Sequence, residues 1–384
     1  MANKDIIVIG ASAGGLNALR ELVKRLPADF AASIFIVQHI SPSSPSYLPQ
    51  ILNRDSAVEC LHPKDGQQIE KGKVYIAVPD HHLLIEKNKI LVKKGPKENR
   101  FRPSVDALFR SAAYNFGTRT IGIILSGLLD DGTSGLWSVR RLGGTTIVQS
   151  PDDALYPDMP VNALEYVDAD HILPVKEIGP AIVRLSAEAA PQQPAIPEED
   201  IGRIATELQI ASQTMDTSMP SLKLGEPSML TCPECNGALS RIEEKKIVRF
   251  RCHTGHAFTE NALLADITKC IEEDLWKAIR GLDESILLLQ EMSGRSSSAG
   301  EWAVKALHQR ISDAKKHSEA IRKTLVSTEQ FNRDTLDKEA GRKPGNGLSG
   351  NFESPRQNGR ASIDDSLQSK SKPGKLPGRK KPKS

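Results

Sequence analysis

A serine flanked by two glycines follows the first apolar run of the chain. The run Ile6–Ile9 leads into Gly10, Ser12 and Gly14, and a helical pattern of leucines begins at Leu16. A serine at such a strand-to-helix turn projects its hydroxyl above the end of a sheet, and the helix N-terminus offers backbone N–H groups to a developing oxyanion. The spacing therefore indicates a nucleophilic serine.

Two other interpretations of this turn are open from the motif alone. A glycine-rich turn after a first strand can cradle the pyrophosphate of a dinucleotide, and a small serine can be purely structural. A dinucleotide-binding domain would carry an acidic residue about 20 residues further on, at the end of the second strand, to hold the ribose. The second apolar run, Ser33–Gln38, leads instead to His39, which disfavours the nucleotide site.

A base and an orienting acid are available at the ends of two further apolar runs. His39 follows the second run, and Asp130 and Asp131 follow the run Thr120–Leu125. Parallel strands present their C-terminal ends at one edge of a sheet, so these side chains can approach Ser12. A serine nucleophile needs a base that a third group holds in one tautomer. We therefore predict the triad Ser12, His39 and Asp131. A structural histidine and, for Asp130, a helix-capping role are the alternatives.

The elements that must position these residues alternate between strands and helices over the first half of the chain. With 384 residues and 39% hydrophobic content, the chain can bury a full core and form more than one domain. The alternation is typical of an α/β domain, and we predict a doubly wound, mostly parallel sheet for residues 1–187. A hairpin turning at Lys87-Asn88 would make this sheet mixed. Strands are expected at Ile6–Ile9, Ser33–Gln38, Lys73–Ala77, Leu83–Glu86, Lys89–Lys93, Thr120–Leu125, Thr145–Val148 and Ala169–Leu173, and helices at Gly15–Arg25, Val105–Tyr114, Ser134–Leu142 and Pro180–Leu185.

The second half of the chain divides by composition. We predict a linker at 188–228, a small zinc-ribbon-like module at 229–259, a helical hairpin at 260–334 and a disordered basic tail at 335–384. From Lys338 onward the tail carries eight more positive than negative charges, so the overall charge of +3 leaves −5 for the rest of the chain. Because the positive excess is confined to the tail, we do not expect the folded part to bind nucleic acid.

Four side chains in the small module have the spacing of a structural zinc site. Cys232 and Cys235 form a Cys-x-x-Cys knuckle, and Cys252 and His256 follow after sixteen intervening residues. Tetrahedral zinc takes four such ligands from two short turns and then has no open position for catalysis. His256 is preferred to His253 because three intervening residues bring it back to the metal more easily. A redox Cys-x-x-Cys is the alternative, although no thioredoxin-like strand and helix surround it.

Six separated motifs resemble the chemotaxis protein-glutamate methylesterase family. They are Val8–Gly15, Val37–His39, Tyr75–Leu83, Arg102–Phe109, Ser126–Gly132 and Asp158–Pro160. The resemblance spans roughly residues 4–187 and implies the family's nucleophile, base and acid at Ser12, His39 and Asp131. It also implies hydrolysis of γ-glutamyl methyl esters on methyl-accepting chemoreceptors, glutamine deamidation as a related activity, and no cofactor for catalysis.

The chain departs from the family pattern in two ways. Leu128 stands where the family usually has methionine, but a backbone donor survives this change, so the N–H groups of Ala13 and Leu128 are the expected oxyanion hole. The family's best-known architecture places a receiver domain before the esterase, whereas this chain begins at the esterase's first strand. Control is therefore expected from a partner, from the C-terminal half, or not at all. The module and hairpin resemble appendages of stand-alone methylesterase domains. Docking to a receptor array or to a kinase or scaffold is one interpretation of the hairpin, and plain packing of its two helices on each other is the alternative.

The composition also bears on where the protein is located, and two alternative functions remain open. The N-terminus lacks a charged and apolar leader, and no apolar run approaches the roughly 18 residues of a membrane span, so we expect a cytoplasmic protein without membrane insertion. Two alternatives to a chemoreceptor esterase are an esterase or amidase acting on another protein or a small ester, and a catalytically silent signalling adaptor. The complete set of Ser12, His39 and Asp131 argues against the adaptor.

Overall fold

The computed structural model describes residues 2–214, 224–295 and 301–327. The first half of the chain forms a seven-stranded sheet in which every neighbouring pair of strands is parallel. The strand order is β3-β4-β2-β1-β7-β8-β9. These strands are β1 (Ile6–Ala11), β2 (Ser33–Gln38), β3 (Glu59–Leu61), β4 (Lys73–Ile76), β7 (Thr120–Ile124), β8 (Thr145–Gln149) and β9 (His171–Leu173).

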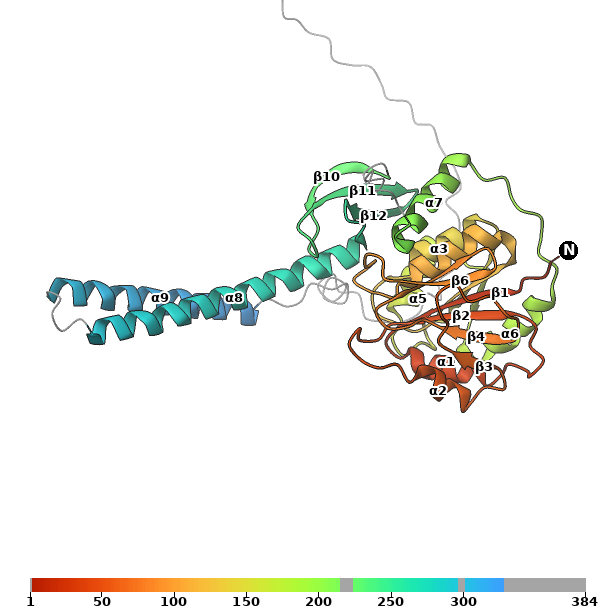
Figure 1. The fold of residues 1–384 in the computed structure, drawn as a ribbon, viewed down its shortest axis with the longest axis horizontal. Coiled ribbons are helices and arrows are strands. Elements are labelled where there is room, and N and C mark those ends of the chain that lie inside the picture. Colours follow the sequence, from red (N-terminus) through yellow and green to blue (C-terminus); the bar gives the residue numbers. More distant parts are fainter. Residues whose placement is uncertain (1, 215–223, 296–300, 328–384) are drawn as a thin grey trace, which may run out of the picture. The chain divides into compact units, whose positions relative to one another are not determined.

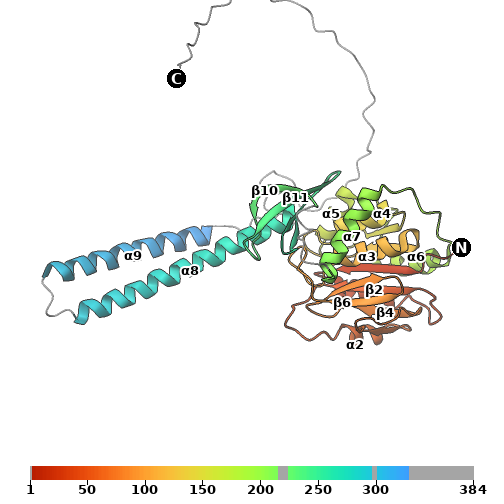
Figure 2. The same cartoon turned by 45° about the horizontal axis from the view of Figure 1, so that its top comes forward.

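Helices cover both faces of this sheet (Figures 1 and 2), which confirms the predicted doubly wound α/β fold. Side chains alternate along β1, so Ile7 and Ile9 join the apolar cluster on one face, and Ile6 and Val8 join the cluster on the other. The first cluster is completed by α1 (Gly15–Val23), α2 (Leu48–Asn53) and α6 (Val175–Ala187). The second is completed by α3 (Val105–Phe116), α4 (Thr133–Arg141) and α5 (Asp158–Tyr166), and the short 3₁₀ helix η1 (Gly117–Arg119) connects α3 to β7.

The expectation of a mixed sheet is wrong. The predicted hairpin forms as β5 (His82–Glu86) and β6 (Lys89–Lys93), but it makes a separate two-stranded antiparallel sheet. Its side chains Leu83, Ile85 and Ile90 are buried in the same apolar cluster as α3. The hairpin therefore covers a face of the parallel sheet instead of extending its edge.

The stretch predicted as a linker contains a helix. Residues 198–212 form α7 (Glu198–Ser212), and its Ile204 is buried in the second apolar cluster. Glu207 on the same helix is also buried, where it pairs with arginines on α3 and on a later strand. Residues 215–223 of the predicted linker lie outside the described residues, and the domain boundaries stay predictions.

The cysteine-bearing module is a four-stranded antiparallel sheet, β10 (Glu226–Thr231), β11 (Ala238–Glu244), β12 (Ile247–Cys252) and β13 (Ala257–Thr259). Its core is small and consists of Leu239, Phe250, Phe258 and Leu263 around Cys232 and Cys252. Two long helices follow, α8 (Glu260–Arg295) and α9 (Glu301–Ser327), and they run side by side in both views. The predicted disordered tail lies outside the described residues. None of the described helices is long and apolar enough to cross a membrane.

Candidate active site and metal centre

The three predicted triad residues follow the carboxyl ends of three neighbouring strands. β1 is hydrogen-bonded to β2 on one side and to β7 on the other. Ala11 lies level with Gln38, and the N–H of His39 donates to the carbonyl of Ala11 over 3.0 Å, so Ser12 and His39 leave their strands side by side. Asp131 follows β7 on the opposite flank of β1. The parallel pairing therefore gathers the triad at one edge of the sheet.

His39 and Asp131 form a buried pair. His39 Nε2 lies 2.8 Å from Asp131 Oδ2, and the two side chains are 3% and 0% exposed. The ring of Phe101 stacks on the imidazole with a centroid separation of 3.7 Å. His39 Nδ1 is buried and has no hydrogen-bond partner in the described part of the chain. One ring nitrogen is therefore oriented by a carboxylate, and the other is available to take a proton.

Asp131 is held as a carboxylate by donors from several elements. Asn99 Nδ2 and Ser104 Oγ each donate to Oδ1 over 2.9 Å, and the N–H of Val105, at the start of α3, donates to Oδ2 over 2.7 Å. Burial alone would raise the pKa of this acid, but the hydrogen bond from His39 and these further donors hold it below its ordinary value of 3.8. An ionised Asp131 can stabilise the imidazolium that forms when His39 takes a proton.

Glycines allow the loops around Ser12 to close. Gly14 has a φ of 73°, in the left-handed region that glycine adopts without strain. A Cβ on Gly127 would lie 2.0 Å from Met159 Sδ and 2.8 Å from Ser12 Cβ, so only glycine lets the loop after β7 approach the serine this closely. The strand-to-helix turn predicted at Ser12 corresponds to the first of these features, and the loop before Asp131 is equally tight.

The Ser12 hydroxyl makes no hydrogen bond to His39 within the described residues. Such bonds are often long before a substrate binds. The backbone N–H groups of Ala13 and Leu128 donate to no acceptor in the ranges that the structure covers. They are therefore free to donate to an oxyanion.

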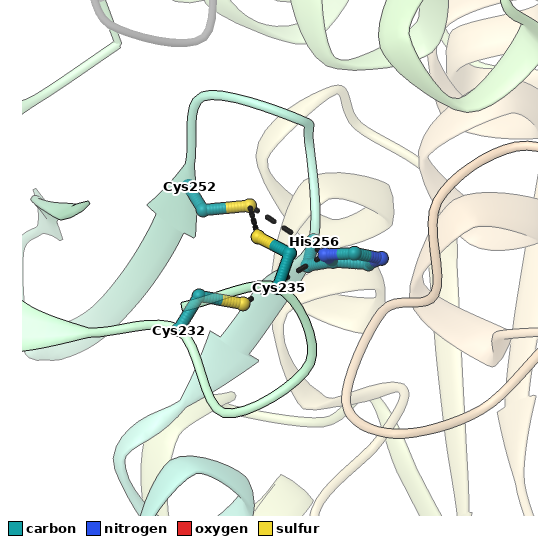
Figure 3. Close-up of side chains that lie close together, drawn as sticks. All are labelled: Cys232, Cys235, Cys252 and His256. Atoms are coloured by element: carbon teal, nitrogen blue, oxygen red, sulfur yellow. Dashed lines mark hydrogen bonds between the residues drawn. The ribbon is translucent and has the colours of Figure 1, made fainter. Parts of the chain in front are cut away.

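The four predicted metal ligands lie together in the module (Figure 3). Cys235 Sγ and Cys252 Sγ are 3.7 Å apart, and His256 Nδ1 lies 3.7 Å from Cys232 Sγ and 3.6 Å from Cys252 Sγ. A tetrahedron with Zn–S bonds of about 2.3 Å and a Zn–N bond of about 2.0 Å has edges of roughly 3.5–3.8 Å. The cluster thus has the dimensions of a four-coordinate metal site, and His253 is not a member of it.

Comparisons with known proteins assign the first half of the chain. Residues 7–182 match the family model described as CheB methylesterase. A relative from Leptospira interrogans, named as a protein-glutamate methylesterase/protein-glutamine glutaminase, is 38% identical over 184 residues, which are 48% of this chain and 95% of that relative. The chain belongs to the CheB methylesterase family.

Two further comparisons with CheB methylesterase proteins have a similar extent. A protein-glutamate methylesterase/protein-glutamine glutaminase 2 of Rhodospirillum rubrum is 38% identical over 185 residues, and the chain spans about half of it, 51%. The crystal structure of the Thermotoga maritima CheB methylesterase catalytic domain is 33% identical and covered completely, with a TM-score of 0.46 and 48% of this chain matched.

Two residues next to the predicted triad of this CheB methylesterase domain, Asn99 and Phe101, were not predicted. Asn99 donates to Asp131, and Phe101 stacks on His39. Asp130, for which helix capping was an alternative, makes no side-chain cap on α4. Its carboxylate accepts hydrogen bonds from Thr259 Oγ1 over 2.8 Å and from Asn261 Nδ2 over 3.3 Å, and burial raises its pKa to about 6. The sequence signal was that Phe101 directly precedes the Arg102–Phe109 motif and Asn99 lies two residues before Phe101.

Proposed function

We propose that this chain is a serine esterase that hydrolyses γ-glutamyl methyl esters on chemoreceptor proteins. The observation that carries the proposal is the buried His39, which Asp131 orients through Nε2 while Nδ1 is left without a partner beside the Ser12 turn. Ser12 Oγ attacks the ester carbonyl as His39 Nδ1 takes the hydroxyl proton. His39 then returns this proton to the leaving methoxide, which departs as methanol and leaves an acyl-serine. Water, deprotonated by His39, cleaves the acyl-serine and restores both side chains.

The oxyanion of each tetrahedral intermediate would accept hydrogen bonds from the N–H groups of Ala13 and Leu128. A preorganised donor of this kind commonly lowers the barrier by about 3 kcal/mol. The substitution of leucine for the family's methionine leaves this donor in place, and the Leu128 side chain is exposed. Catalysis in this scheme requires no cofactor.

The substrate is proposed from the names of the relatives. Proteins from Leptospira interrogans and Rhodospirillum rubrum are named for both methylesterase and glutaminase activity. The two reactions share one acyl-enzyme and differ in the leaving group, methanol or ammonia, so the same site can serve both. All five cysteines are free thiols, which fits a reducing compartment, and we propose the cytoplasm as the location.

The test is methanol release from methylated chemoreceptor signalling domains by the full chain. We expect Ser12→Ala to abolish release, because Ser12 is the proposed nucleophile and the nearby Ser126 hydroxyl is engaged with the carbonyl of Ala13 over 2.8 Å. Ser186→Ala is the matched control, since Ser186 Oγ only donates to the carbonyl of Val183 within α6. Equal release by the wild-type chain and Ser12→Ala would overturn the proposed mechanism. Release from a small glutamyl methyl ester but not from receptors would favour the alternative esterase.

We also propose that Cys232, Cys235, Cys252 and His256 hold one structural zinc ion. The support is the set of ligand-atom separations, all within 4.8 Å, and the closed set of four protein ligands. Zinc would cross-link two turns of a module whose apolar core is small. The prediction that α8 and α9 dock to a kinase or scaffold stays a prediction, although Leu287 and Trp302 on these helices are exposed.

Metal content measured on the purified full chain tests the zinc proposal. We expect one zinc ion per chain, and its loss in Cys252→Ser. Cys270→Ser is the matched control, because the Cys270 thiol donates weakly to the carbonyl of Pro233 and lies outside the cluster. A zinc content near zero in the wild-type chain, or an unchanged content in Cys252→Ser, would contradict the proposal.

A further inference from the structure

One short segment, residues 97–101, connects the cysteine-bearing module to the triad. Four consecutive residues of this segment are held through their side chains, the first three by the module and Arg100 by Asp266 on α8. Lys97 Nζ lies 2.7 Å from Glu234, Glu98 lies 2.9 Å from Arg251, Asn99 Oδ1 accepts from the N–H of Thr259 over 2.9 Å, and Arg100 Nε lies 2.6 Å from Asp266. The backbone N–H of Asn99 also donates to the carbonyl of Ala257 over 2.8 Å. The module and the beginning of α8 therefore hold this segment along its length.

The same segment contacts two of the three triad residues. Asn99 Nδ2 donates to Asp131 Oδ1 over 2.9 Å and to Asp106 Oδ2 over 2.8 Å, and all three side chains are buried. Phe101 stacks on the imidazole of His39. The orientation of the acid and of the base thus depends on where residues 99 and 101 lie.

The module determines which end of the Asn99 amide faces the carboxylates. An asparagine amide can present either its NH₂ group or its oxygen. With the oxygen turned toward Asp131 and Asp106, three acceptors would meet in a buried site, which is costly. The N–H of Thr259 prevents this because it donates to Asn99 Oδ1 and leaves the NH₂ group for the two acids. A residue of β13 therefore sets the hydrogen bond that Asp131 receives.

We infer that Asn99 and Thr259 are positioning residues of the esterase, and that metal binding in the module governs the reactivity of Ser12 through them. This inference rests on the proposed function. Both metal-binding turns reach the 97–101 segment: Glu234 lies between Cys232 and Cys235, and Gly255, next to His256, accepts a hydrogen bond from Arg251, the partner of Glu98. Thr259 follows His256 by three residues on the same short stretch of chain.

Substitution of Asn99 tests the positioning role in the full chain. Asn99→Asp keeps the shape of the side chain and tolerates the φ of 49°, but it removes the donor and adds a negative charge. We expect kcat to fall by roughly tenfold to a hundredfold, as on loss of a hydrogen bond to a charged group, with little change in KM. Asn115→Asp is the matched control, because among the described residues the Asn115 amide donates to the carbonyls of Ile85 and Ser111 and accepts from the N–H of Lys87.

The pH profile separates positioning from a structural role. The titratable groups that face Asp131 are His39, Asp106, Asp130 and His82. An Asp131 that has lost a donor and gained a negative neighbour is protonated more readily, so the acid limb of kcat/KM should move to higher pH in Asn99→Asp. The limb should stay in place in Asn115→Asp. An unmoved limb in Asn99→Asp, or equal losses of kcat in both variants, would overturn the positioning role.

Removal of the metal tests the coupling. Ser12 labelling by a sulfonyl fluoride, followed by mass spectrometry, reports the reactivity of the nucleophile without any receptor. We expect a chelator to slow the labelling of Ser12 in the zinc-loaded wild-type chain, and to slow it by a smaller factor in Asn99→Asp. In the wild-type chain the chelator should also speed amide hydrogen exchange at residues 97–101. Added Zn²⁺ should restore all three. Unchanged labelling and exchange after loss of the metal would overturn the coupling.

The two proposals can fail separately. If the wild-type chain is labelled at Ser12 but releases no methanol from receptors, the proposed substrate is wrong, and the labelling rates still decide the coupling. If Ser12 is not labelled in the zinc-loaded chain, the triad itself is wrong and the inference fails with it.

Discussion

The core of the parallel sheet and the contact between that domain and the cysteine-bearing module are equally buried but opposite in chemistry. The sheet core is mainly apolar, with Ile7, Ile9 and Ile34 completely buried. The contact, here called the charged seam, holds three acids and three arginines with at most 8% exposure: Glu98, Arg110, Glu207, Glu244, Arg249 and Arg251. These residues come from the 97–101 segment, α3, α7, β11 and β12.

The difference teaches what each region contributes. Apolar burial stabilises without direction, at about 25 cal/mol per Å² of surface removed from water. Buried ion pairs often give little net stability, because desolvation offsets their attraction, but they are specific in geometry. Arg110 and Arg251 both pair with Glu98, which directly precedes Asn99. We propose that these ion pairs determine the position of the module relative to Asn99 and therefore relative to the predicted triad.

Breaking one charge in the seam should have the largest effect on stability. In Glu207→Gln, Arg249 and Arg110 lose a buried partner, and we expect the free energy of unfolding in urea to fall by about 3–5 kcal/mol. Glu199→Gln is the control on the same helix, because its pair with Arg203 is largely exposed. Equal losses in the two variants would contradict the importance of burial.

This effect should depend on pH. Burial alone would raise the pKa of Glu207, but Arg249, Arg110 and Arg251 hold it well below its ordinary value of 4.5. A depressed folded-state pKa contributes stability above the unfolded-state value, and this stability is lost as pH falls through the folded-state value. The difference between the wild-type chain and Glu207→Gln should therefore be complete at neutral pH and shrink below about pH 4.

Removing apolar volume from the sheet core should be nearly as costly, but without this pH dependence. Ile34→Ala deletes a fully buried side chain, and we expect a loss of about 2–5 kcal/mol from lost transfer energy and the remaining cavity. Ile172→Ala, at a half-exposed position in β9, should cost far less. If the loss of unfolding free energy in Ile34→Ala varied with pH in the way expected for Glu207→Gln, the proposed contrast between the two regions would be wrong.

The same contrast explains how much the sequence could predict. β1 and the middle of β2 are apolar because both faces are covered, so their runs were recognisable, and their order placed Ser12, His39 and Asp131 at one edge. The three-residue strand β3 and the six-residue helix α2 were not predicted, since short elements carry little periodicity, and the nine-residue helix α5 was also missed. The hairpin β5-β6 was predicted, but its pattern does not specify which sheet it joins.

The seam and the residues beside the triad could not be predicted. α7 lies in a stretch of polar composition, and its stability depends on Glu207 meeting arginines about 40 and 100 residues away in sequence. The role of Asn99 depends on its hydrogen bond from Thr259 of the module, which is 160 residues away in the sequence. Sequence patterns indicate local features such as periodicity and turns. The contacts of Glu207 and Asn99 join residues that are far apart in the sequence, and no local pattern indicates them.

Asp130 is a buried acid that differs from the acids of the charged seam, because its partners are a hydroxyl and an amide instead of an arginine. Its pKa is raised from 3.8 to about 6, mainly by burial. A raised folded-state pKa contributes stability below the unfolded-state value, and this is lost as pH rises through the folded-state value. Asp130→Asn should therefore be more stable than the wild-type chain at pH 7, by at most about 3 kcal/mol, and lose this advantage below about pH 4.

Urea unfolding of Asp130→Asn at these two pH values is the measurement. The exposed Asp152→Asn is the control and should show no such gain. A destabilised Asp130→Asn at pH 7 would mean that the hydrogen bonds from Thr259 and Asn261 outweigh the cost of burying the charge.

The smallest effect is expected where charges pair at an exposed site. Asp283 on α8 accepts hydrogen bonds from Ser318 over 3.0 Å and from Arg322 over 2.6 Å on α9, and the two charged side chains are nearly half exposed. Solvent and salt screen such a pair, so Asp283→Ala should cost only about 0.2–1 kcal/mol, and less at high salt. Urea unfolding at low and high salt measures this, with zinc content and Ser12 labelling expected to stay at wild-type values. If Asp283→Ala cost as much as Glu207→Gln, ion pairing itself and not its burial would be what stabilises this chain, and the seam would lose its special role.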